Sequence, residues 1–167
     1  LITQSVGTDA DAHILSLALA ESGKINLISL RYINFRAAED EAPEIKEQGI
    51  LNASESLSLA GADANTRGIL VGQDWYFVVG NKVYTSPVLM PQLADLTTLP
   101  DGLGVPVAVA VSSKETHLII ATYDASSSHE NKGSFALVDL ITKEVKVYRN
   151  VMGKCVVAKG FDANPWF

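Results

Sequence analysis

Short runs of apolar and β-branched residues, separated by polar turns, recur along the chain. The second half contains four such runs, at residues 105–111, 118–123, 135–140 and 145–149. Runs of about four to eight residues bounded by turn-forming residues are typical of β-strands. In the last run Val145 and Val147 alternate with polar neighbours, which predicts an edge strand with one face in water. We therefore expect four consecutive strands in residues 105–151, with the more continuously apolar strands inside.

The same order of runs occurs immediately upstream. Four runs lie at residues 67–71, 75–79, 82–87 and 93–99. Gly80 and Asn81 separate the middle two, and both residue types tolerate the positive φ angles of a two-residue hairpin turn. Ile69 and Val109 hold equivalent places 40 positions apart in the two groups. The sequence therefore contains a repeat of about 40 residues with four strands in each copy.

A repeated four-stranded antiparallel unit of this period is typical of a β-propeller blade. Runs at residues 1–6, 13–20 and 24–32 then correspond to the last three strands of a preceding blade, and Lys154–Lys159 to the innermost strand of one more. The sequence thus predicts an all-β fold of consecutive four-stranded antiparallel blades of a partial β-propeller, about three in number. A β-sandwich, in which similar short strands recur without a strict period, is the alternative.

We expect a single β domain over residues 1–167. Within it the pattern predicts a partial blade, an acidic loop or short helix, two complete blades, and a closing strand with a tail, at residues 1–36, 37–65, 66–100, 105–151 and 152–167. Pro43 and the neighbouring acids Glu39, Asp40 and Glu41 argue against a core element in the acidic segment.

Three blades are fewer than the four that usually close a ring. Either further blades precede Leu1, or two copies of the chain pair into a larger ring, so a homodimer is one expected assembly. The chain starts at Leu1 without a Met, a basic leader or an apolar signal core, and we expect that start to result from processing or cleavage.

Composition and charge exclude several classes of protein. Apolar residues make up 47% and charged residues 19% of the chain, which excludes intrinsic disorder and a highly charged coiled coil. The chain has 13 Lys and Arg and 19 Asp and Glu, and its basic residues form no cluster along the sequence. Nucleic acid is therefore not an expected partner. No uncharged stretch reaches the roughly 18 residues that a membrane-spanning helix needs, so we expect no membrane span.

Few residues point to chemistry. Asp9, Asp11 and His13 alternate and could share one face of a strand, but the further ligands of a calcium loop are missing, so we expect no metal. The single cysteine, Cys155, lies in an apolar run that favours a core position over a nucleophile. The sequence contains His117 but no glycine-flanked Ser of the kind that serves as the nucleophile of serine hydrolases. We therefore expect no cofactor and assign no catalytic residue.

Aromatic residues offer the best candidates for a ligand-binding surface. Trp75, Tyr76 and Tyr84 lie around the predicted hairpin, and Trp166 lies near the end of the chain. Exposed aromatic rings stack on sugar faces and anchor protein partners. These four are the candidate ligand-binding residues, although the strand that carries Trp75 and Tyr76 also suits both to core packing.

Three sequence segments resemble a known family. The hairpin Val78–Tyr84, the phrase Leu96–Gly102 and the segment Gly153–Val157, together with the four-strand repeat, resemble the β-propeller portions of cell-surface lipoproteins from gut Bacteroidetes, including those described as PKD-like. The resemblance covers residues 66–167 and rests on pattern. It implies a secreted, lipid-anchored binding or scaffold protein associated with the uptake of polymers, and it carries over no catalytic residues.

These observations favour a non-enzymatic binding or scaffold module of a secreted or surface-anchored protein, with a carbohydrate or a protein as ligand. The expected location is extracytoplasmic, at the cell surface or in the periplasm. One alternative is a propeller-based glycan hydrolase or lyase, in which acids from several blades converge on a central channel. Another is a β-sandwich that serves as a structural or adhesive module.

Overall fold

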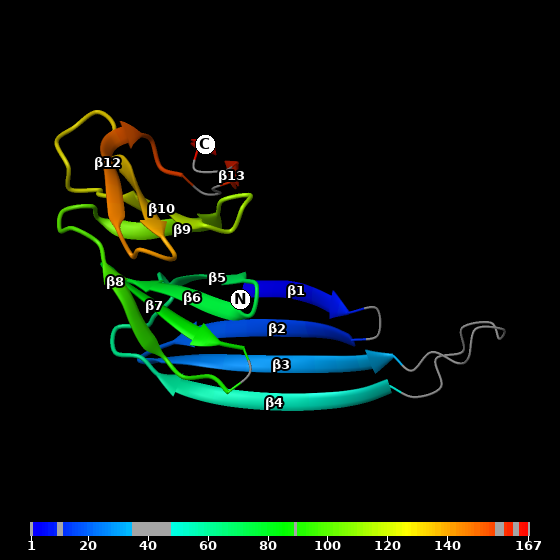
Figure 1. The fold of residues 1–167 in the computed structure, drawn as a ribbon. Helices are drawn as coiled ribbons and strands as arrows, with labels where there is room; N and C mark the ends of the chain where they lie inside the picture. The colour runs from blue at the N-terminus through cyan, green and yellow to red at the C-terminus, as the bar shows by residue number, and fades with distance from the viewer. Residues whose placement is uncertain are drawn as a thin grey trace.

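The computed structural model describes residues 2–9, 12–34, 48–88, 90–155, 159–161 and 164–166. Every regular element in these ranges is a β-strand (Figure 1). Accordingly, this part of the chain contains no helix that could cross a membrane. The prediction of an all-β fold is confirmed for these residues.

The strands form three four-stranded antiparallel sheets and one hairpin, and the spatial order of strands in each sheet follows the chain order. The first sheet consists of β1 (Ile2–Asp9), β2 (Ala12–Glu21), β3 (Lys24–Asn34) and β4 (Gln48–Ser58). The second sheet consists of β5 (Arg67–Val71), β6 (Asp74–Val79), β7 (Lys82–Pro87) and β8 (Ala94–Thr98). The third sheet consists of β9 (Val105–Val111), β10 (His117–Tyr123), β11 (Gly133–Asp139) and β12 (Val145–Met152). The hairpin consists of β13 (Lys159–Phe161) and β14 (Asn164–Trp166).

The predicted strands of the two repeats correspond to β5–β8 and β9–β12. The expected turn at Gly80 and Asn81 joins β6 to β7, and Gly80 has a φ of 58°. This left-handed backbone conformation carries no steric penalty for glycine, which is why a two-residue connection can close the hairpin there.

The first sheet corrects two expectations. It is a complete four-stranded unit that begins with β1, whereas the sequence pattern assigned only the last three strands of a blade to residues 1–36. Residues 48–58, which the pattern placed in the acidic insertion, form β4 and pair along their whole length with β3. The segment 48–58 contains several Ser residues and few apolar ones, so its strand character comes from hydrogen bonding to β3 rather than from its own pattern. The rest of the acidic stretch, residues 37–47 with Pro43, lies outside the described residues.

The closing strand expected at Lys154–Lys159 is also corrected. Lys154 and Cys155 lie outside any strand, residues 156–158 are outside the described ranges, and β13 begins only at Lys159. Cys155 is half-buried, so it is a boundary residue and not the core residue that its apolar neighbours predict.

Apolar side chains fill the space between the first and second sheets. Ala18, Ile25 and Leu27 of β2 and β3 pack with Trp75 and Phe77 of β6. The rings of Trp75 and Phe77 stack with their centroids 5.7 Å apart. The long apolar side chains of β6 that point towards the first sheet therefore supply much of this core.

A second core joins the second and third sheets. It contains Val78 of β6 and Val83 of β7 on one side, and Leu118, Ile120 and Val138 of β10 and β11 on the other. Because successive residues of a strand point to opposite faces, β6 contributes to both cores. A sheet covered on both faces requires apolar residues at every position of its central strands, which explains the uninterrupted apolar run at residues 75–79.

The far face of the third sheet carries a smaller apolar cluster. Ala110, Ile119, Phe135 and Leu137 are buried there, and the rings of Phe135 and Tyr148 stack 4.5 Å apart. This face differs from the other side of the same sheet because no second sheet among the described residues supplies side chains to it.

The first strands of successive sheets are neighbours. β5 lies against β1, β9 lies against β5, and β13 lies against β9 (Figure 1). The three sheets therefore meet along their first strands, while their later strands extend outward. The junction of β5 and β9 is where the candidate site is found.

Candidate functional site

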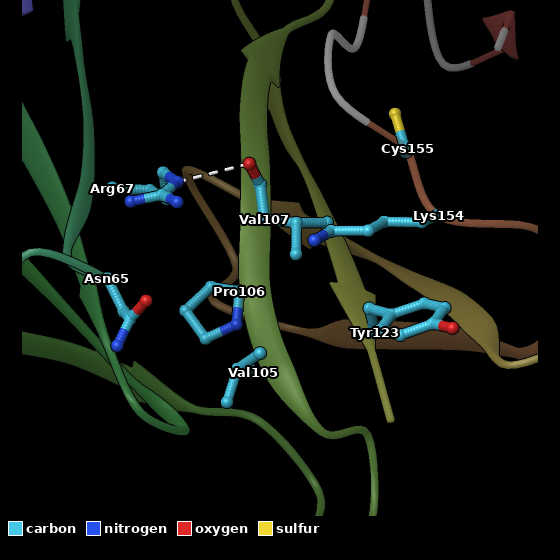
Figure 2. A pocket seen from close by; sticks show the side chains of 8 residues that line it. All are labelled: Asn65, Arg67, Val105, Pro106, Val107, Tyr123, Lys154 and Cys155. Carbon is cyan, nitrogen blue, oxygen red and sulfur yellow. Dashed lines mark hydrogen bonds between the residues drawn. The ribbon is translucent and has the colours of Figure 1, made fainter. Parts of the chain in front are cut away.

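A pocket of about 340 Å³ lies at the junction of the second and third sheets (Figure 2). Its lining comes from the start of β5 with the loop before it, from the start of β9 and the end of β10, and from the segment that follows β12. Pockets of this size fall within the range that holds small ligands. Segments far apart in the sequence therefore converge on one concave site.

Arg67, the first residue of β5, spans the two sheets. Its Nε donates a hydrogen bond to the carbonyl oxygen of Val107 in β9 over 3.0 Å (Figure 2). Its Nη1 donates to the carbonyl oxygens of Ala64 and Thr66 over 3.0 and 3.1 Å. All three acceptors are neutral backbone groups, so they hold the guanidinium in place without neutralising its positive charge.

A β-bulge presents the carbonyl that Arg67 binds. In the register between β9 and β10, Ala108 pairs with Ala121 and Pro106 pairs with Thr122. Val107 lies between these two pairs and has no pairing partner in β10. Pro106 has no backbone N–H to give to the ladder, which is why the strand is irregular at this point. A bulge of this kind redirects the local backbone, and here it lies directly at the pocket.

Lys154 supplies a second positive charge. It lies after β12, and Figure 2 shows its side chain extending back towards β9. Its Nζ lies 5.8 Å from the centroid of the Tyr123 ring, a cation–π distance. The other lining residues are Asn65, Val105, Pro106, Val107 and Cys155, so no acidic side chain lines the pocket among the described residues.

The connection between β8 and β9 leads into the pocket lining at Val105. Gly104 has a φ of 81°, and a Cβ on it would lie 2.3 Å from the carbonyl oxygen of Tyr123. Arg149 of β12 fixes the same connection, because its Nη2 donates to the carbonyl oxygen of Asp101 over 2.9 Å and its Nη1 donates to that of Gly102 over 3.2 Å. These contacts restrain the connection that leads into β9.

A second concave region lies on the far face of the third sheet. It has a volume of about 610 Å³, and its lining includes His117, Asp139, Glu144, Lys146 and Tyr148. His117 Nε2 lies 3.5 Å from Asp139 Oδ2. This region holds two carboxylates and an imidazole, so it is where acid–base chemistry would be sought.

Asp139, however, is engaged in the turn after β11. Its Oδ1 accepts hydrogen bonds from the backbone N–H groups of Ile141 and Thr142, each over 2.8 Å. These bonds, with a smaller contribution from the nearby His117, hold the pKa of the Asp139 carboxyl below its ordinary value. A general acid in glycoside hydrolysis needs a raised pKa. The pKa of Asp139 is lowered, so its surroundings do not favour that role.

Thr116 beside His117 is also structural. Its Oγ1 lies 2.9 Å from His117 Nδ1 and 3.3 Å from Ser112 Oγ. The Oγ of buried Ser112 accepts hydrogen bonds from the backbone N–H groups of Thr116 and His117, each over 3.1 Å. These bonds close the turn between β9 and β10, and they account for the short contact between a hydroxyl and an imidazole.

The aromatic residues suggested by the sequence do not form one platform. Trp75 is 0% exposed in the core between the first and second sheets, so it has no surface for a ligand. Tyr84 packs against that same core, whereas Tyr76 packs against the core on the other face of the sheet. Burial, and secondarily the charge of Asp74, raise the pKa of the Tyr76 hydroxyl. Trp166 lies in β14, and its side chain is outside the described set.

The three metal-ligand candidates of the sequence analysis, Asp9, Asp11 and His13, lie near the start of the chain. Asp11 lies outside the described residues, and the side chains of Asp9 and His13 are likewise not described. Among the side chains that are described, no group of three or more His, Cys, Asp and Glu residues is placed to hold a metal ion.

Sequence reasoning missed Arg67, Tyr123 and Lys154. The one local signal was Pro106 inside an apparent strand, since proline in a strand marks an edge or a bulge. Comparison with known proteins adds no family to this picture, because no protein-family model and no curated protein matches the chain.

Proposed function

We propose that this chain is a non-enzymatic binding module of β-propeller type, whose ligand, a carbohydrate or a protein segment, occupies the pocket between β5 and β9. The observation that carries the proposal is the convergence of β5, β9, β10 and the segment after β12 on one pocket where the first strands meet. In a propeller the blades surround a central channel, and such a junction is where a ligand can contact several blades at once.

The arrangement of the sheets favours a propeller over a sandwich. The three sheets repeat one strand order, each buries apolar side chains against the next, and their first strands are neighbours. The hairpin β13–β14 starts with a strand against β9, which is the position expected for the start of a fourth sheet. A sandwich instead packs two sheets face to face around one core.

The chemistry of the pocket favours binding over catalysis. Its described lining lacks a carboxylate, so it does not hold the pair of carboxylic acids that glycoside hydrolysis uses. The carboxylates and the imidazole lie on the far face of the third sheet, where Asp139 caps a turn. By analogy with the lipoproteins that the sequence resembles, we propose an extracytoplasmic location for the parent protein.

The test combines binding with turnover. Isothermal titration calorimetry with cello-, malto-, xylo- and galacturonate oligosaccharides and with a mixed peptide library measures binding, and a reducing-end assay on the same sugars measures cleavage. We expect binding by at least one ligand class without release of reducing ends. Cleavage that is lost in Asp139→Asn or Glu144→Gln would contradict the proposal in favour of a glycan hydrolase or lyase. Absence of binding across both panels would also contradict it.

A further inference from the structure

We propose that the pocket between β5 and β9 binds an oxyanion group of its ligand, a carboxylate, sulfate or phosphate, and that Arg67 Nη2 and Lys154 Nζ are the cationic groups of its lining that favour it. This inference rests on the proposed binding function and specifies the charge of the ligand. It arises from the combination of two cationic side chains with a described lining that contains no acid.

The guanidinium of Arg67 is fixed with part of its donor set unused. Hydrogen bonds from Nε and Nη1 go to three backbone carbonyls. Nη2 donates to no acceptor among the residues that the structure describes, so two N–H groups of a fixed guanidinium remain for a ligand. A guanidinium held in this way is pre-organised for an oxyanion, because little side-chain entropy is lost when the ligand binds.

Lys154 supplies the second cationic group of the lining. The ring of Tyr123 holds its ammonium at 5.8 Å by a cation–π contact, which stabilises the charge without neutralising it. No carboxylate in the described part of the chain forms an ion pair with Lys154. The ammonium therefore keeps its hydrogen-bond donors for a ligand in the pocket, because a cation–π contact uses none of its N–H groups as a conventional hydrogen bond.

The electrostatics favour an anion over a neutral ligand. A half-buried guanidinium with no acidic partner in the described ranges carries a desolvation cost that a bound oxyanion relieves. The lysine lies over the Tyr123 ring, so it competes with a neutral sugar for stacking on that ring. The chain as a whole has a net charge of −6, which repels anions at a distance, so selection depends on these two short-range contacts.

The decisive experiment compares three small probes. Two-dimensional ¹H–¹⁵N NMR titrations of the wild-type chain at low ionic strength use D-glucuronate, its neutral analogue D-glucose, and inorganic sulfate. We expect glucuronate to shift the amide resonances of Val107 and Tyr123, glucose to leave them unchanged, and added sodium chloride to weaken the binding. Sulfate that competes with glucuronate supports a general oxyanion site, whereas glucuronate binding without sulfate binding supports a site for acidic sugars.

Two matched variants locate the site. Lys154→Gln removes one of the two proposed contacts, and we expect it to weaken glucuronate or sulfate binding about tenfold. Lys146→Gln is the control, because Lys146 Nζ lies in the same way 5.2 Å from the centroid of the Tyr148 ring but on the far face of the third sheet. Equal effects of the two variants would overturn the assignment of the site.

The remaining outcomes distinguish failure of the oxyanion inference from failure of the proposed binding function. If glucose shifts the same resonances as strongly as glucuronate, the oxyanion inference is wrong and the binding function stands. If none of the three probes binds while a neutral oligosaccharide or an uncharged peptide does, the same conclusion holds. If neither these probes nor the broader ligand panels bind, the proposed function itself is contradicted.

Discussion

Arg67 and Val107 lie 40 positions apart in the sequence and are joined by a hydrogen bond of 3.0 Å from Nε to the carbonyl oxygen. Arg67 is the first residue of β5 and Val107 the third residue of β9, so the two residues belong to the first strands of the second and third sheets. The bond therefore links one sheet to the next, and it places a positive charge at the junction.

Arg67→Met tests this link. The substitution keeps much of the apolar volume and removes the three hydrogen bonds, so we expect the free energy of unfolding to fall by about 2 kcal/mol. Urea denaturation measures the change. Arg149→Met is the control, since Arg149 also donates to two backbone carbonyls but is exposed, and its loss should cost less than about 1 kcal/mol. Equal losses would mean that Arg67 has no special role in joining the sheets.

Gly104→Ala should be strongly destabilising. The new Cβ would lie 2.3 Å from the carbonyl oxygen of Tyr123, and the φ of 81° is itself unfavourable for alanine. We expect a loss of about 3 kcal/mol from the steric overlap and the backbone strain together.

Gly72→Ala isolates the backbone strain from the steric overlap. Gly72 has a φ of 59°, and apart from its chain neighbours no atom lies within 4 Å of the position that a Cβ would take. Only the strain, about 1 kcal/mol, should therefore appear in the same urea denaturation. A Gly104→Ala variant as stable as Gly72→Ala would show that the connection before β9 can move away from Tyr123.

Asp139 should make the free energy of unfolding depend on pH in the acidic range. Its pKa is lowered in the folded chain mainly by the backbone N–H groups of Thr142 and Ile141, so folding favours the ionised form. The stabilisation is fully present above the pKa of an unfolded Asp, about 3.9, and is lost as the pH falls through the lower folded value. The stability difference between the wild type and Asp139→Asn should therefore shrink below about pH 4 in urea denaturation series. A difference that grows with acid would contradict the assignment.

Trp75 should report the core and remain silent towards ligands. The chain contains two tryptophans, so Trp166→Phe leaves Trp75 as the single tryptophan, which excitation at a wavelength that tyrosine does not absorb observes alone. Because Trp75 is 0% exposed, we expect blue-shifted fluorescence with weak acrylamide quenching, unchanged by any ligand that binds the pocket. Trp75→Ala should cost about 3–5 kcal/mol of stability through the cavity that it leaves. Strong quenching in the folded state would instead return Trp75 to the candidate binding residues.

The strands of the second and third sheets were predictable because their signals are local. The apolar runs at residues 75–79 and 118–123, and the glycine turn at Gly80, each reflect neighbouring residues that fold together. In contrast, β4 carries a weak pattern, and its pairing with β3 across residues 35–47 supplies the hydrogen bonds that make it a strand. Non-local pairing of this kind leaves little trace in the composition of a segment.

The candidate site shows the same difference between local sequence signals and non-local packing. The aromatic residues around the hairpin were visible in the sequence, but alternation along β6 turns Trp75 towards one core and Tyr76 towards the other. Arg67 and Lys154 are separate surface charges in the sequence, and only the packing of the sheets brings them to one pocket.

Local patterns were enough to predict that this protein is built from strands in consecutive groups of four, because alternation and turn chemistry act between near neighbours. The tertiary structure decided which faces are covered and which charges meet. Those outcomes depend on how one sheet packs against the next, and the side chains that control this packing lie a whole repeat apart.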